Sequence, residues 1–196
     1  LTLRYAFATA ILVLLAKILR EPLRITRTEI FQSMKVGLFL QVIYIGGVFY
    51  SVSHGVSAGV TSVIVSMQPI VVSILGVRIL NERLNLQKIA GLFLGFFGVF
   101  ILLNPKIIEG VIDFQFSAAG ITASFIALVG TTAGYLLQKK GGAEIPFLPG
   151  TAVQFATATI SFVIAAFLFE DWNVDFNLQF LAALSWFVLA LSIGSI

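Results

Sequence analysis

Long apolar runs alternate with short polar connections along the whole chain. Seven of these runs have the length of a helix that crosses roughly 30 Å of hydrocarbon. Their approximate limits are residues 1–19, 36–52, 58–80, 84–103, 118–137, 151–169 and 180–196. The first run is short for a span and depends on Arg4 and Lys17 extending their charged ends toward the headgroups. The pattern predicts an all-α, polytopic membrane protein with seven transmembrane helices and no room for a soluble domain.

Residues 58–103 form the centre of this pattern. Two apolar runs flank the polar turn Asn81-Glu82-Arg83, and the first run carries Gln68 and Pro69 near its middle. Proline removes one backbone hydrogen bond, and lipid cannot satisfy the carbonyl that is freed. We therefore expect this face of the hairpin to look onto protein or onto a watery cavity.

Composition supports the same class and excludes others. The chain has 59% hydrophobic and 11% charged residues, and its mean hydropathy of +1.04 is far above that of a soluble domain. It has no cysteine and one histidine, which excludes a thiolate nucleophile and a multi-histidine metal centre. The seven apolar runs contain no Asp or Glu, so neither an enzyme site nor a proton relay is indicated. No basic patch with interleaved aromatics suggests nucleic acid, and we expect no cofactor.

The basic residues predict an orientation. If alternate connections lie on opposite sides, only Arg4 and Lys106 fall on one side. The other side carries Lys17, Arg20, Arg24, Arg27, Lys35, Arg78, Arg83, Lys88, Lys139 and Lys140. The basic side of a membrane protein is usually cytoplasmic. We therefore expect Leu1 on the outer side of a plasma membrane, such as a bacterial inner membrane.

A weak internal repeat adds a second level of organisation. The sequence RYAFAT at 4–9 is similar to QFATAT at 154–159. The two copies lie five spans apart and so cross in opposite directions, as inverted repeats do. In this register residues 1–104 form a first repeat that lacks its first helix, and residues 116–196 a second that lacks its last two. We expect one further span before residue 1 and two after residue 196.

Several short motifs together resemble one transporter family. They are LRY at 3–5, SAGVT at 57–61 followed by Gln68-Pro69, NERL at 81–84, GYLLQKK at 134–140, Gln154-Phe155 and the closing segment 184–194. Their order and spacing resemble the drug/metabolite transporter superfamily, EamA type, over nearly the whole chain. The resemblance implies ten helices in two inverted five-helix repeats, with helices two to eight present here. It also implies a secondary transporter of small metabolites, amino acids or drugs that needs no cofactor.

Polar residues at helical spacing indicate a cavity. Ser124, Thr131, Tyr135 and Gln138 form one stripe, and Gln41 and Tyr44, three apart, should meet on one side of their helix. A polar stripe in lipid must face protein or water. The candidate cavity residues are Gln41, Tyr44, Ser66, Gln68, Pro69, Thr131, Tyr135, Gln154 and Trp186. For the serines and threonines we favour helix packing and bonding to their own carbonyls over substrate contact.

The mechanism we expect is alternating access, with the lipid bilayer and a small solute as partners. A channel or a non-transporting membrane adaptor is the alternative, because a polar stripe can also line a pore. Gly91, Gly95 and Gly98 form a small-residue face. This face favours close packing within the fold and is also compatible with a homodimer.

Overall fold

The computed structural model describes residues 1–21, 25–79, 90–91, 93–94, 97, 117–141, 145–169, 177–188 and 190. Every regular element in these ranges is a helix. Most of the predicted span at 84–103, the Asn81-Glu82-Arg83 turn and the predicted repeat boundaries at 104 and 116 lie outside them.

Four stretches of the described chain are long and apolar enough to cross a membrane. They are Arg27–Ser53, Ala58–Ile79, Ala118–Gly141 and Phe147–Phe169. Two further helices are shorter, α1 (Thr2–Ile18) and α9 (Leu178–Val188). The predicted all-α, polytopic architecture is confirmed. The chain divides into two compact units, one made of Leu1–Val42 with Leu137–Ile196 (unit 1) and the other of Ile43–Leu136 (unit 2).

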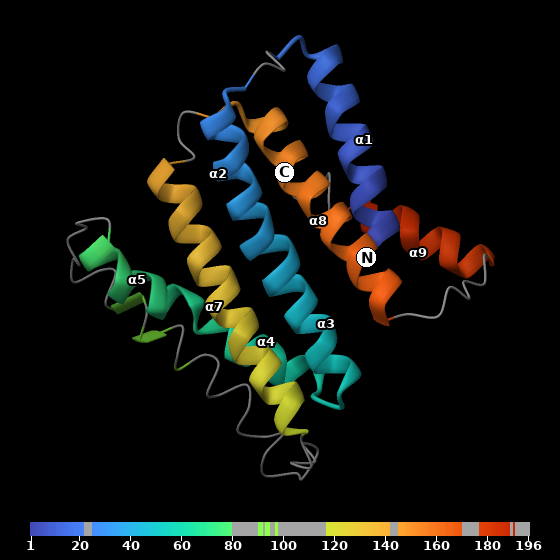
Figure 1. The fold of residues 1–196 in the computed structure, drawn as a ribbon. Helices are drawn as coiled ribbons and strands as arrows, with labels where there is room; N and C mark the ends of the chain where they lie inside the picture. The colour runs from blue at the N-terminus through green and yellow to red at the C-terminus, as the bar shows by residue number, and fades with distance from the viewer. Residues whose placement is uncertain are drawn as a thin grey trace. The chain divides into compact units, whose positions relative to one another are not determined.

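Unit 1 is built around α8 (Phe147–Phe169), which packs against both α1 and α2 (Arg27–Gly37). Helices α1 and α8 run in opposite directions (Figure 1). Their shared core consists of Tyr5, Ala8, Leu12, Ala16, Leu148, Ala152, Phe155 and Ala158. Small alanine side chains let two helix backbones approach closely, which is how helices gain dispersion energy in a bilayer.

Tyr5 is the largest fully buried side chain of this core. Its ring lies edge-on to Phe155, with centroids 5.3 Å apart, and stacks on Phe162 at 5.7 Å. Its hydroxyl donates a hydrogen bond of 2.9 Å to Oε1 of Gln41. The neighbouring residue Arg4 connects α1 to α9, with its guanidinium 5.6 Å from the ring centroid of Phe187. Tyr5 therefore ties three helical segments of unit 1 together.

Helix α2 begins well before the apolar run that predicted it. The run starts at residue 36, but the helix starts at Arg27, because Thr26 and Glu29 form a reciprocal capping box at its N-terminus. Hydropathy detects only the part of a helix that lies in lipid. In the same way, α8 starts at Phe147 and not at residue 151.

The middle of the spanning stretch Arg27–Ser53 is a π-helix, η1 (Leu38–Ile45), which leads into α3 (Gly46–Ser53). In a π-helix the backbone bonds run from i to i+5, so each turn holds more residues than an α-turn. Side chains three apart then no longer share a side. The expectation that Gln41 and Tyr44 meet on one side is therefore wrong: Gln41 bonds to Tyr5, whereas Tyr44 lines a pocket in unit 2.

Unit 2 contains α3, α4 (Ala58–Ser66), α5 (Gln68–Ile79) and most of α7 (Ala118–Gly141). The tight turn between α3 and α4 needs Gly55, whose φ is +86°. A Cβ on Gly47 would lie 3.1 Å from the carbonyl oxygen of Ala123, so α3 and α7 pack with their backbones close. These contacts fix the walls of the unit's pocket.

The predicted single run at 58–80 is two helices. Helix α4 ends at Ser66, Met67 lies between, and α5 starts at Gln68. Pro69 has no N–H to donate, and the N–H groups of Ile70 and Val71 both bond to the carbonyl of Met67, at 3.0 and 3.2 Å. The helix is thus interrupted at Met67, two residues before the proline.

Candidate substrate pocket

A pocket of about 360 Å³ lies beside the break between α4 and α5. Its lining comes from η1 and α3 on one side and from α4, the break and α5 on the other. The lining residues are Tyr44, Val48, Thr61, Ser62, Val65, Ser66, Gln68 and Pro69. All of them belong to unit 2. This volume falls in the range of pockets that hold small organic ligands.

Two of the serines in the lining are already bonded to their own helix. The hydroxyl of Ser62 donates to the carbonyl of Ala58 at 2.6 Å, and that of Ser66 donates to the carbonyl of Val63 at 2.7 Å. The expected bonding of these serines to their own helix is therefore present, although both side chains are exposed. Ser66 therefore contributes surface to the pocket while its hydroxyl is engaged elsewhere.

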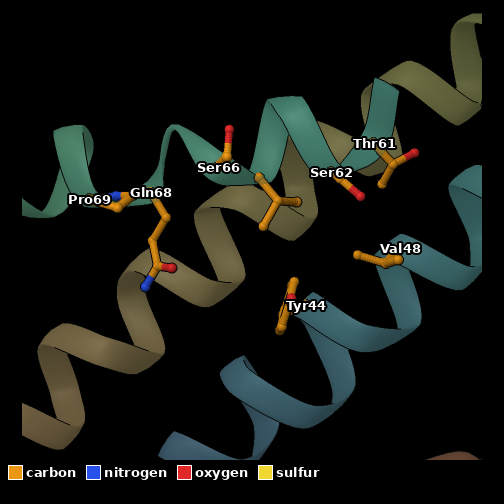
Figure 2. Close-up of a pocket in the computed structure, with 8 residues that line it drawn as sticks. Tyr44, Val48, Thr61, Ser62, Ser66, Gln68 and Pro69 are labelled. Carbon is orange, nitrogen blue, oxygen red and sulfur yellow. The ribbon is translucent and has the colours of Figure 1, made fainter. Parts of the chain in front are cut away.

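The polar groups of Tyr44 and Gln68, unlike those of Ser62 and Ser66, are not engaged in hydrogen bonds with the residues that the structure describes. Within the described chain, neither the Tyr44 hydroxyl nor the Gln68 carboxamide makes a hydrogen bond. Figure 2 shows Tyr44 between its own helix and α4, while the Gln68 side chain extends away from the start of α5. One phenol and one carboxamide of the described lining thus have their full hydrogen-bonding capacity available to a ligand, whereas Ser62 and Ser66 can only accept.

Three buried hydroxyls form a cluster next to the pocket wall at Thr61. Ser51 Oγ lies 3.0 Å from Thr61 Oγ1 and 2.7 Å from Ser124 Oγ, and Ser124 donates to the carbonyl of Gly120. All three side chains are at most 1% exposed. The cluster connects α3, α4 and α7, and through Thr61 it reaches the pocket wall. Buried hydroxyls in a bilayer need such partners, because lipid supplies none.

Ser51 escaped the sequence-based prediction. Ser124 lies on a predicted polar stripe, but Ser51 lies near the end of an apolar run, next to the short polar connection that follows it. Its partners come from 10 and 73 residues away along the chain. A signal of this kind is visible only once the helices are packed.

The remaining candidate residues do not line this pocket. In unit 2, Thr131 is buried in α7 and Tyr135 is 43% exposed. In unit 1, Gln41 bonds to Tyr5, Gln154 lies at the close approach of α8 to Gly37, and Trp186 in α9 is 67% exposed. The structure therefore brings together Tyr44, Ser66, Gln68 and Pro69 from the predicted set.

Apolar helices of spanning length define a polytopic α-helical membrane protein, and a pocket lies beside the break between two of its helices. Comparison with protein families gives the more specific assignment. The model of the EamA-like transporter family matches residues 1–104, which is more than half of the chain. The chain belongs to this family.

Curated relatives carry transporter names without an assigned substrate. An uncharacterized transporter of Archaeoglobus fulgidus is 31% identical over 54% of this chain and 37% of its own length. The uncharacterized transporters YvbV and YoaV of Bacillus subtilis are 26% and 25% identical, over 70% and 86% of this chain and 47% and 56% of their own lengths. The chain thus spans about half the length of the relatives it matches or less. No solved structure matches it.

Proposed function

We propose that the protein is a secondary transporter that moves small metabolites, amino acids or drugs across the membrane by alternating access. The observation that carries the proposal is the pocket beside the α4–α5 break, where Tyr44 and Gln68 have polar groups without a hydrogen bond in the described chain. Transporters place their substrate sites at discontinuous helices, because irregular backbone at membrane depth is tolerated only along a cavity. Apolar groups such as Val48 and Pro69 would cover the body of the solute.

The inverted repeat is part of the same proposal. Tyr5 and Phe155 occupy equivalent positions of the two repeated sequences, and their rings contact each other across the antiparallel pair α1 and α8. Contact between equivalent residues is what a two-fold axis between these helices would produce. The family match also ends at residue 104, where the first repeat is predicted to end. Translation of the coding sequence that flanks the chain tests this, since one upstream and two downstream spans are expected.

We propose an orientation with Leu1 and the α3–α4 turn on the outer side of a bacterial inner membrane, from the ten-to-two distribution of basic residues. The chain has no cysteine, so a single one can report the side on which it lies. His54→Cys in the α3–α4 turn should react with a membrane-impermeant thiol reagent added outside intact cells. Reaction only after the cytoplasmic side is opened would reverse the orientation.

Counterflow in proteoliposomes tests the transport function. The chain, together with the sequence that flanks it in its gene, is reconstituted with a high internal concentration of one unlabelled solute from a metabolite panel. A carrier should take up trace labelled solute transiently, and the initial rate should saturate with concentration. Tyr44→Phe should lower the rate about tenfold for solutes that hydrogen-bond to the phenol. Uptake that rises linearly and shows no exchange would favour a channel, the alternative function.

A further inference from the structure

None of the described residues that line the pocket carries an ionised side chain. Of these eight residues, three are apolar with Pro69 included, and the other five carry only hydroxyl or carboxamide groups. Moving a charge from water into such a site is costly unless an opposite charge meets it there. A charged ligand that contacts these residues alone therefore loses the hydration of its charge on binding and gains no ion pair in return.

The two available polar groups have complementary capacities. A carboxamide offers two N–H donors and a carbonyl acceptor, and a phenol can donate or accept. Gln68 and Tyr44 come from opposite sides of the pocket (Figure 2). Together they match a head group that both donates and accepts hydrogen bonds without being ionised. Val48 and Val65 offer apolar surface next to it.

We propose that this pocket selects uncharged solutes whose head is a neutral donor–acceptor group, such as a primary amide, attached to an apolar body. The inference rests on the proposed function, in which this pocket is the substrate site. Gln68 is the specificity-determining residue, because its carboxamide can pair with the donor and the acceptor of an amide at once. A carboxylate ligand could accept hydrogen bonds from the N–H groups of Gln68, but its negative charge would stay uncompensated. An ammonium or amidinium ligand would find no anion among the described lining residues to pair with its positive charge.

Three probes of nearly the same shape test the charge preference: benzamide is neutral, benzoate is an anion and benzamidine is a cation. Binding to the protein in nanodiscs is measured by saturation-transfer NMR, with empty nanodiscs as the blank. Benzamide should bind at least about tenfold more tightly than either ion. Equal or tighter binding of benzoate or benzamidine, or no binding of benzamide, would overturn the proposal.

Variants at Gln68 separate recognition from folding. Gln68→Leu should weaken benzamide binding about tenfold, while Gln138→Leu, at an exposed position on α7 that does not line the pocket, should leave it unchanged. Gln68→Glu should reverse the order so that benzamidine binds most tightly, a gain that a misfolded protein cannot produce. An unchanged order in Gln68→Glu would reject Gln68 as the specificity determinant.

Counterflow in proteoliposomes made from the same purified protein distinguishes this inference from the proposed function. Saturable exchange together with unselective probe binding would reject the neutral preference and leave transport standing. Selective benzamide binding without exchange of any solute would reject transport and show that the charge preference belongs to a binding site of another kind.

Discussion

Tyr5→Ala is expected to destabilise unit 1 more than any other single truncation considered for this chain. Tyr5 is fully buried and contacts two aromatic rings. Removing its ring leaves a cavity, and truncating a buried aromatic residue costs about 3–5 kcal/mol in well-packed cores. Lipid does not add a hydrophobic term between helices, so the loss is one of packing and of the hydrogen bond to Gln41. Unfolding in mixed detergent micelles, followed by circular dichroism, measures the change.

Two further variants resolve the contributions of this residue. Tyr5→Phe keeps the ring contacts and loses only the hydrogen bond, so it should cost about 0.6–1.7 kcal/mol, as interhelical hydrogen bonds do in membranes. Phe7→Ala truncates a neighbouring aromatic side chain that is 52% exposed on the same helix, and should have little effect. If Tyr5→Ala were as mild as Phe7→Ala, the core assigned to α1 and α8 would be wrong.

Gly37→Ala is expected to cause the next largest loss of stability. Here the cause is an added atom that overpacks a helix contact, whereas Tyr5→Ala leaves a cavity. A Cβ at this position would lie 2.7 Å from both Cα and the carbonyl oxygen of Gln154. Both obstacles are backbone atoms, so no rotamer change relieves the clash, and α2 and α8 must move apart. Overpacking of this kind costs about 1–3 kcal/mol. The same unfolding measurement should show it, together with a loss of resistance to proteolysis.

Gly59→Ala is the matched control. It also lies in a helix of a membrane-spanning stretch, but the nearest atom to its added Cβ would be Ser57 Oγ, at 3.9 Å. Alanine has the higher helix propensity, by about 1 kcal/mol, so this variant should be neutral or more stable. Equal losses in the two variants would mean that glycine content, and not the α2–α8 approach, determines the stability.

The sequence predicts those features that depend on composition along one helix. The lengths of apolar runs predicted the spanning stretches, and the proline at position 69 predicted an irregular backbone beside a cavity. The boundaries were less accurate, because the Thr26–Glu29 capping box starts α2 in the polar region, which hydropathy does not detect. The back-bonding of Ser62 and Ser66 also followed from the residue types alone.

Features that depend on packing between segments were not predictable. The apolar pattern of the sequence does not reveal that backbone bonding in η1 changes from i+4 to i+5. This change places Gln41 against Tyr5 and Tyr44 in the pocket lining. The Ser51 hydroxyl cluster likewise depends on partners far along the chain. The candidate set therefore contained Tyr44, Ser66 and Gln68 of the pocket lining and missed Thr61 and Ser62, and it could not separate the former from polar residues that lie elsewhere.

The most direct test of the central claim, that this pocket is the substrate site of a carrier, is the accessibility of Gln68→Cys. No other cysteine is present in the chain, so a membrane-impermeant thiol reagent reports this position alone, and His54→Cys serves as the control for sidedness. In oriented vesicles Gln68→Cys should react with reagent added to either side, and a transported solute should slow both reactions. Reaction from one side only, without protection by any solute that the protein exchanges, would contradict the account.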